Sequence, residues 1–196
     1  TAVTVAQFNL LDAATSSAIV LSGGISDTAA NLAPGGTASS GLTNSTTQDG
    51  DVAITITGTA PTVAELNKIA SLTTGAVTAS ISGNKADLAT LTTASTDAVT
   101  MTVTDAVTVA EFNTLDGKTS VGVILTGGVS DAAAAYAATN GTATAGRTAI
   151  AAQDGDAALT VTDAATVAQA NSVATATTGT VVYSGGITDS AANLMN

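Results

Sequence analysis

The sequence predicts an α/β repeat protein: a solenoid-like stack of units, each made of a helix, a strand, a short helix and a second strand. Three observations predict it: a six-residue phrase that recurs four times, alternating apolar segments that follow each phrase, and few large apolar side chains. Strands that alternate with helices pair in parallel through crossovers, so we expect parallel strands. The alternatives are a β-rich sandwich, in which the short helices are turns, and a single pseudo-symmetric α/β domain.

The recurring phrase reads Thr-Val-Ala-Glu/Gln-x-Asn and begins at Thr4, Thr62, Thr108 and Thr166. The first and third copies lie 104 residues apart, and so do the second and fourth. The longer units carry about 12 more residues before a Gln-Asp-Gly-Asp sequence, and we expect these extra residues to form a loop. We therefore predict two super-repeats: residues 1–107, made of units 1–61 and 62–107, and residues 108–196, made of unit 108–165 and the incomplete unit 166–196.

Each phrase predicts the start of a helix. The Thr side chain can accept a hydrogen bond from the backbone N–H three residues on, and the Glu or Gln can reach back to the Thr amide. In the third copy Val109, Phe112 and Leu115 then follow at helical spacing. The Asn of each phrase is a poor helix-interior residue, so we expect a ladder of amides that bond the backbone of the next rung of the stack, with sugar binding as the alternative; these residues are Asn9, Asn67, Asn113 and Asn171.

Two strands are expected in each unit because apolar and polar residues alternate. The first set spans residues 17–22, 75–82, 121–126 and 180–184, and the second set spans 52–57, 99–104 and 157–162. Three members of the first set run into Gly-Gly and then an Asp. We expect Asp27, Asp131 and Asp189 to be N-caps of the short helices, with a column of metal ligands as the alternative.

Composition and charge exclude several classes of protein. The chain has no Cys, His or Trp and a net charge of −11, so the common nucleophile–base pairs and zinc sites are absent and we expect no enzyme. Fifteen acids against four bases also disfavour nucleic acid and anionic membranes as partners. No apolar stretch of about 18 residues occurs, so no membrane insertion is expected.

Calcium is the most specific ligand that the sequence suggests. Asp49 and Asp51 flank one glycine, and Asp154 and Asp156 flank another, in segments that enter strands. Carboxylate oxygens are the ligands that Ca²⁺ prefers. Asp-Gly is also a common turn dipeptide, so a plain turn is the alternative interpretation of both sequences.

Rows of threonine mark the second set of strands. The residues expected to point the same way are Thr55 and Thr57, then Thr100, Thr102 and Thr104, then Thr160 and Thr162. Stacked repeats would array them in a flat grid, which resembles the ice-binding faces of antifreeze β-solenoids. A solvated strand face rich in Thr, or one carrying O-linked glycans, is the alternative.

Three phrases carry a family resemblance: the recurring Thr-Val-Ala-Glu/Gln-x-Asn, Gly-Gly-Ile-Ser-Asp followed by Thr-Ala-Ala-Asn-Leu, and Val-Thr-Asp-Ala. They resemble repeats in very large secreted surface proteins of cyanobacteria and other marine bacteria. The resemblance implies an extracellular or cell-surface array in a fibre, surface layer or adhesin. We expect a non-enzymatic structural subunit or segment that assembles with itself end to end. An adhesin stalk or phage-fibre module that binds cell-surface glycans is the alternative.

Overall fold

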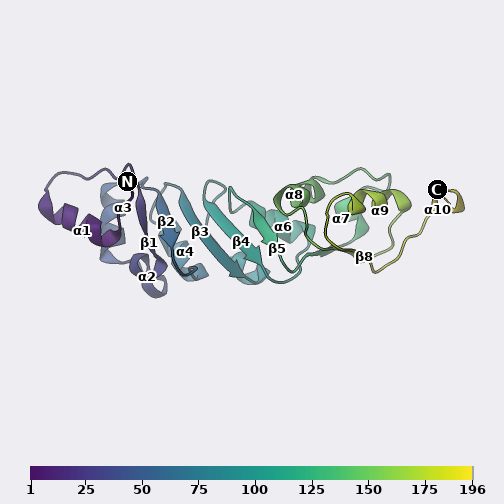
Figure 1. Cartoon of the computed structure of the whole chain (residues 1–196), viewed down its shortest axis with the longest axis horizontal. Coiled ribbons are helices and arrows are strands. Elements are labelled where there is room, and N and C mark those ends of the chain that lie inside the picture. The colour runs from purple at the N-terminus through teal and green to yellow at the C-terminus, as the bar shows by residue number, and fades with distance from the viewer. Residues whose placement is uncertain (196) are drawn as a thin grey trace. The chain divides into compact units, whose positions relative to one another are not determined.

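The computed structural model describes residues 1–195, in which short helices and parallel strands alternate (Figure 1). One sheet has five strands in the order β1-β2-β3-β4-β5, and the other has three in the order β6-β7-β8. The predicted α/β class with parallel strands is confirmed. The β-rich sandwich is wrong, because helices lie between the strands that pair, and these strands run in parallel.

Every element is short. The strands are β1 (Ile25–Thr28), β2 (Ile54–Thr57), β3 (Val77–Gly83), β4 (Ala98–Val103), β5 (Val123–Leu125), β6 (Val129–Asp131), β7 (Leu159–Val161) and β8 (Val181–Tyr183). The helices are α1 (Val5–Ala14), α2 (Ala29–Leu32), the 3₁₀ turn η1 (Pro34–Gly36), α3 (Ser40–Gln48), α4 (Val63–Ala70), α5 (Lys85–Leu88), α6 (Val109–Asp116), α7 (Ala133–Tyr136), α8 (Ala145–Gln153), α9 (Val167–Ala174) and α10 (Ala191–Leu194).

The chain forms two compact units, each with its own core. The first comprises Thr1–Ser82, Thr90–Met101 and Gly117–Val121, and the second comprises Gly83–Ala89, Thr102–Asp116 and Gly122–Asn196. These units follow the packing, whereas the super-repeats follow the sequence, so the predicted limits at 107 and 108 stay a prediction. Asn196, the last residue of that prediction, lies outside the described residues.

In the first unit, strand register stacks equivalent apolar residues. Ile25 pairs with Ile54, and Ile54 pairs with Val77. All three side chains are buried, and they form one row of the core. In the second unit Val129, Leu159 and Val181 pair in the same way, with Val129 and Leu159 buried and Val181 partly exposed.

The four predicted helix starts are confirmed. Each Thr side chain accepts the N–H of the residue three positions on, and each Glu or Gln side chain accepts the N–H of its Thr. These bonds satisfy helix donors that have no partner inside the helix. The side chain at the next position faces the core in all four helices, as Phe8, Leu66, Phe112 and Ala170.

Two local expectations are wrong. Residues 17–22 form no strand, although their counterpart contains β5 and the last predicted segment contains β8. The extra residues of the longer units are not loops, because they contribute to the helices α3 and α8. Ser39 and Thr144 cap these helices with their hydroxyls, and neither cap is followed by the Glu or Gln of a capping box. The weaker signal explains why the sequence did not reveal them.

Candidate functional site

The most regular feature of the structure is the junction between successive repeats. At each junction a helix that begins with the recurring phrase packs on the short helix of the preceding repeat. Thus α4 packs on α2 and η1, α6 packs on α5, and α9 packs on α7. Three copies of the same packing make this junction the candidate functional surface of the chain.

One helix position reports how well each junction is covered. Seven residues after the capping Thr, the side chains of Ile69, Leu115 and Val173 are at most 1% exposed. The fourth counterpart, Leu11 of α1, is 47% exposed, and its neighbour Leu10 is 74% exposed. In the described structure no short helix precedes α1, so this apolar position has no cover.

Aspartates join the elements of each repeat through the backbone. Asp27 Oδ2 accepts the N–H of Val5, the first residue of α1, at 3.1 Å. Asp131 and Asp189 do the same for the first residues of α6 and α9, at 3.0 and 3.1 Å. Each carboxylate therefore stabilises the N-terminus of the long helix of its own repeat, where negative charge is favoured.

The predicted N-cap role of these three aspartates is wrong. The N-caps of α2, α7 and α10 are the residues that follow them, Thr28, Ala132 and Ser190. Each aspartate also accepts the N–H of that following residue, at 2.7–2.8 Å. Each carboxylate thus already accepts backbone donors at the starts of two helices of its repeat, which disfavours the alternative of a metal column.

Two further aspartates, which the sequence prediction missed, also accept the first backbone N–H of a helix. Asp105 accepts the N–H of Lys85 at 2.7 Å and Asp163 accepts that of Ala133 at 2.6 Å, at the first residues of α5 and α7. Both belong to the phrase Val-Thr-Asp-Ala, whose recurrence was the available signal. Asn67 bonds the backbone of the next rung, as expected, because its amide nitrogen donates to Thr90 O at 3.0 Å and its amide oxygen accepts from Thr92 N at 2.8 Å.

The four candidate calcium ligands divide into two kinds. Asp49 Oδ2 accepts the N–H of Leu21, and Asp154 Oδ2 accepts that of Leu125, both at 2.5 Å. Asp51 and Asp156 are exposed. Partial burial raises the pKa of Asp154, and the neighbouring Asp156 adds to this. Within residues 1–195 no three acidic side chains gather as a metal would require, so calcium stays a prediction that rests on two carboxylates per turn.

The first unit carries rows of hydroxyls on one face of its sheet. In register, Ser26 pairs with Thr55, which pairs with Thr78, and Thr28 pairs with Thr57. These rows contain the predicted Thr55 and Thr57 together with Ser and Thr residues that the prediction missed. In the second unit Thr160 pairs with Ser130 on one side and with Val182 on the other. The row of hydroxyls therefore ends at Thr160. Thr104 and Thr162 fall just beyond β4 and β7.

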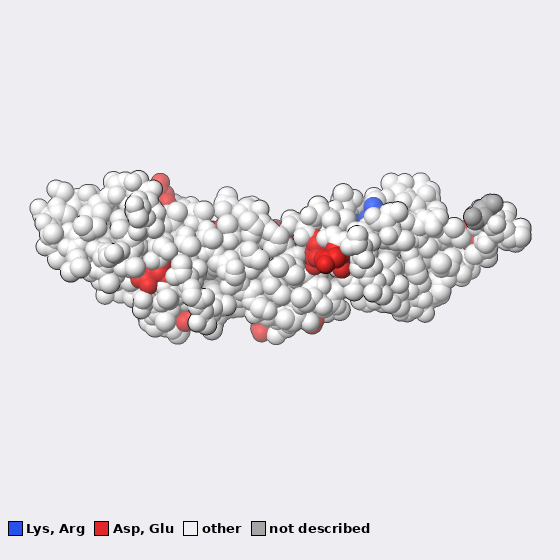
Figure 2. Space-filling model, viewed as in Figure 1, with Lys and Arg blue, Asp and Glu red and all other residues white. Residues whose placement is uncertain are grey.

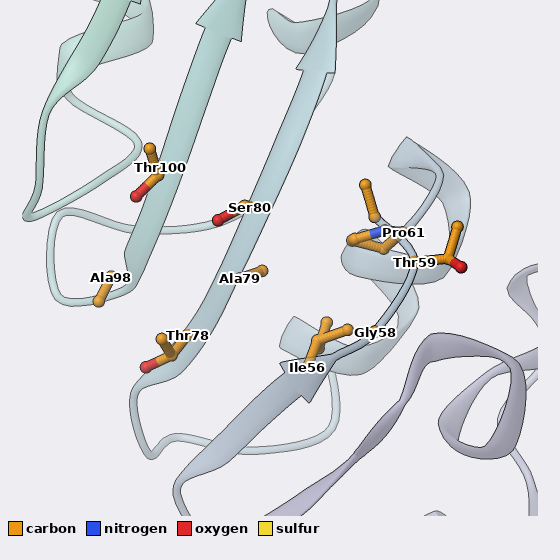
Figure 3. Close-up of a pocket in the computed structure, with 10 residues that line it drawn as sticks. Ile56, Gly58, Thr59, Pro61, Thr78, Ala79, Ser80, Ala98 and Thr100 are labelled. Carbon is orange, nitrogen blue, oxygen red and sulfur yellow. The ribbon is translucent and has the colours of Figure 1, made fainter.

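A hollow of about 230 Å³ lies beside these rows. Thr78 and Ser80 come from β3 and Thr100 from β4, while Ile56 and Pro61 come from the end of β2 and the segment after it (Figure 3). No charged side chain lines the hollow. Its mixture of hydroxyls and small apolar groups offers weak, adaptable contacts and no acid or base for catalysis.

Charge is spread thinly over the surface. Figure 2 shows separate acidic patches on a mostly uncharged face, with a small basic area. In the second unit Lys85 Nζ lies 2.9 Å from Glu111 Oε2. The pKa of Glu111 is lowered first by the hydrogen bond from the Thr108 backbone and then by Lys85. The ion pair links α5 to α6 across one junction.

Comparison of the chain with protein-family models, with curated proteins and with solved structures finds no match. Within residues 1–195, no helix combines the length and the apolar character that crossing a membrane requires.

Proposed function

We propose that this chain is an extracellular structural protein: a self-assembling subunit, or a segment, of a filament, fibre or surface layer. Repeats stack on one another in a solenoid, and copies join end to end by strand pairing. The role is mechanical and needs no catalytic group. The extracellular location rests on the resemblance of the recurring phrases to repeats of secreted surface proteins.

The observation that carries this proposal is the difference between covered and uncovered copies of one junction. Leu11 is 47% exposed where its three counterparts are buried. Ile187 is 45% exposed, whereas Ile25 and Val129, which also follow Gly-Gly, are 1% exposed. Apolar positions that other repeats of this chain bury are therefore exposed at Leu11 and Ile187, which supports a subunit or segment that stacks on further repeats.

Sedimentation velocity over a range of protein concentrations tests self-assembly, with negative-stain micrographs to show the form of any polymer. The measurement is repeated at several salt concentrations, because a net charge of −11 makes copies repel and salt screens that repulsion. A parallel series with calcium and with a chelator, at matched ionic strength, tests the predicted calcium sites. We expect species that grow with protein concentration. A monodisperse monomer under all these conditions would refute the proposal.

The rows of hydroxyls favour ice binding as a second candidate function. Neighbouring strands place the members of one row about 4.8 Å apart, and successive rows, carried by alternate residues of each strand, lie about 6.7 Å apart. Thr55 and Thr57 are exposed within these rows. Thermal hysteresis and the shape of ice crystals test the idea, with Thr55→Lys as the variant. An unchanged freezing point and unshaped crystals would reject it.

A further inference from the structure

Three of the four repeats pair the residue before the capping Thr with backbone at a Gly-Gly turn. Val3 N donates to Gly24 O at 3.1 Å, and Val3 O accepts from Ser26 N at 2.9 Å. Val107 and Ala165 make the same two bonds in their own repeats, at 3.1 and 2.8 Å. In each of these repeats one residue of extended backbone therefore uses a donor and an acceptor that would otherwise be free.

The remaining repeat carries Pro61 at this position. Residues 59–64 read Thr-Ala-Pro-Thr-Val-Ala, whereas residues 1–6 read Thr-Ala-Val-Thr-Val-Ala, so the two segments differ only by the proline. Proline has no backbone N–H and cannot make the first of the two bonds. In the part of the chain that the structure describes, Pro61 makes neither bond.

Strand β3 has a free stretch on the side of β2 as a result. Its pairing with β2 ends after Thr78. Ile54 N, at the start of β2, donates to Ala76 O at 3.0 Å. Backbone groups of alternate strand residues point to the same neighbour, so those of Ser80 and Ser82 also point toward β2. Within residues 1–195 neither serine has a backbone partner on that side, and both are exposed.

The second unit contains the equivalent pair of strands without this gap. There β7 and β8 pair as far as Val161 and Tyr183, and Ser184 N donates to Val161 O at 2.8 Å. The corresponding groups in the first unit are Ile56 O and Ser80 N, and pairing ends before them. The gap is therefore a property of this one repeat and not of the fold.

The segment before the capping Thr accounts for the gap. It spans residues 57–61, one residue more than the equivalent 162–165 of the second unit. Gly58 adopts a left-handed φ of +75°, and the chain then runs apart from β3 (Figure 3). The hollow of about 230 Å³ described above lies here, with Pro61 and Ser80 among its lining residues and no charged side chain.

We infer that this gap binds an extended peptide segment of another protein, which pairs with Ser80 and Ser82 and supplies the N–H that Pro61 lacks. The three paired repeats indicate what fits, because the residue that pairs in them is Val or Ala. The uncharged hollow favours a segment of small, uncharged residues, and bonds to a free strand edge are a general mode of peptide binding. The inference does not depend on self-assembly, because the gap lies within the first unit.

Two blocked peptides test the pairing by NMR titration of the unmodified chain. Both are acetylated and amidated; one has the sequence of residues 1–6 and the other that of residues 59–64. We expect the first to shift the amide signals of Ser80 and Ser82 to saturation. The second should bind about tenfold more weakly, because its proline leaves one hydrogen bond unmade. Equal affinities, or shifts confined to other strands, would overturn the inference.

The variant Pro61→Val tests the gap from the side of the protein. It makes residues 59–64 identical to residues 1–6, so the chain should fill its own gap. We expect peptide binding to weaken at least about tenfold. Without any peptide, the amide of Ser82 should exchange with deuterium more slowly, because it gains the bond that Ser26 makes to Val3.

The matched control is Ala165→Val, which makes the same residue at the equivalent position of the second unit, where the pairing already exists. It should leave peptide binding unchanged, and circular dichroism checks that both variants fold. Undiminished peptide binding by a folded Pro61→Val variant would show that the peptide does not occupy the place beside Pro61, and the inference would be wrong.

Discussion

Helices α1 and α6 have nearly the same sequence and differ mainly in their surroundings. Both begin with the same cap, both bury a Phe completely, and the first N–H of both is bound by an aspartate 22 residues later in the chain. Leu115 of α6 is 1% exposed because α5 packs against that helix, whereas Leu11 of α1 is 47% exposed. In this protein, burial of an apolar residue is therefore decided by the junction between repeats and not by the helix that carries it.

The strongest test of this comparison replaces the two leucines. Leu115→Ala should lower the free energy of unfolding by about 2–5 kcal/mol, because it removes a buried side chain and leaves a cavity. Leu11→Ala should lower it by less than about 1 kcal/mol, because water already reaches that side chain. Urea denaturation of the monomer measures both, and equal losses would contradict the comparison.

A glycine at a covered junction provides the second test. A Cβ at Gly127 would lie 2.1 Å from the carbonyl carbon of Asp105, so Gly127→Ala must displace backbone and should cost about 1–3 kcal/mol. The control is Gly155→Ala in the exposed turn, where the nearest atom would lie at 3.4 Å. Thermal unfolding should separate the two variants clearly, and equal midpoints would contradict the tight packing at Asp105.

The aspartate bonds give a third, smaller difference. Asp27 is 6% exposed, so Asp27→Ala leaves the N–H of Val5 with poor access to water and should cost about 1–3 kcal/mol. Asp189 makes the same bond to Val167 at a more open site, where water can replace the carboxylate, so Asp189→Ala should cost less. Chemical denaturation checks the order, and a larger loss at Asp189 would reverse our interpretation.

The smallest effect is a dependence on pH. Backbone hydrogen bonds from Thr62 and Thr108 lower the pKa of Glu65 and Glu111 below their ordinary value. Their stabilising contribution is therefore complete above the unfolded pKa, near 4.3, and is lost as the pH falls through the lower folded values. Asp154 has a raised pKa, so it acts in the opposite direction and favours folding slightly as it becomes protonated.

The variant Glu111→Gln keeps the capping box, because Gln occupies this position in two other copies, and removes the charge that pairs with Lys85. We expect a smaller loss of melting temperature between pH 5 and pH 3 in this variant than in the unmodified chain. An unchanged pH profile would show that the carboxylate of Glu111 contributes nothing to stability.

The sequence predicted whatever depends on residues close together in the chain. The capping boxes are local, and alternation over residues 75–82 was enough to locate β3. The same kind of pattern failed at residues 17–22, because a strand also needs a neighbour and a pattern does not show whether one is present. The aspartates were noticed through their recurrence, but their partners lie 20–30 residues away, so the local N-cap interpretation of Asp27 was wrong.

The junctions described above all run in one direction. In each, a short helix packs against the long helix of the next repeat, and within the repeats aspartates bond the backbone of helices that come earlier in the chain. Stacking that follows this rule has no two-fold axis, so a fibre built from the chain would be polar, with two chemically distinct ends. Its ends would then add subunits at different rates, and a cell could anchor one end while the other elongates.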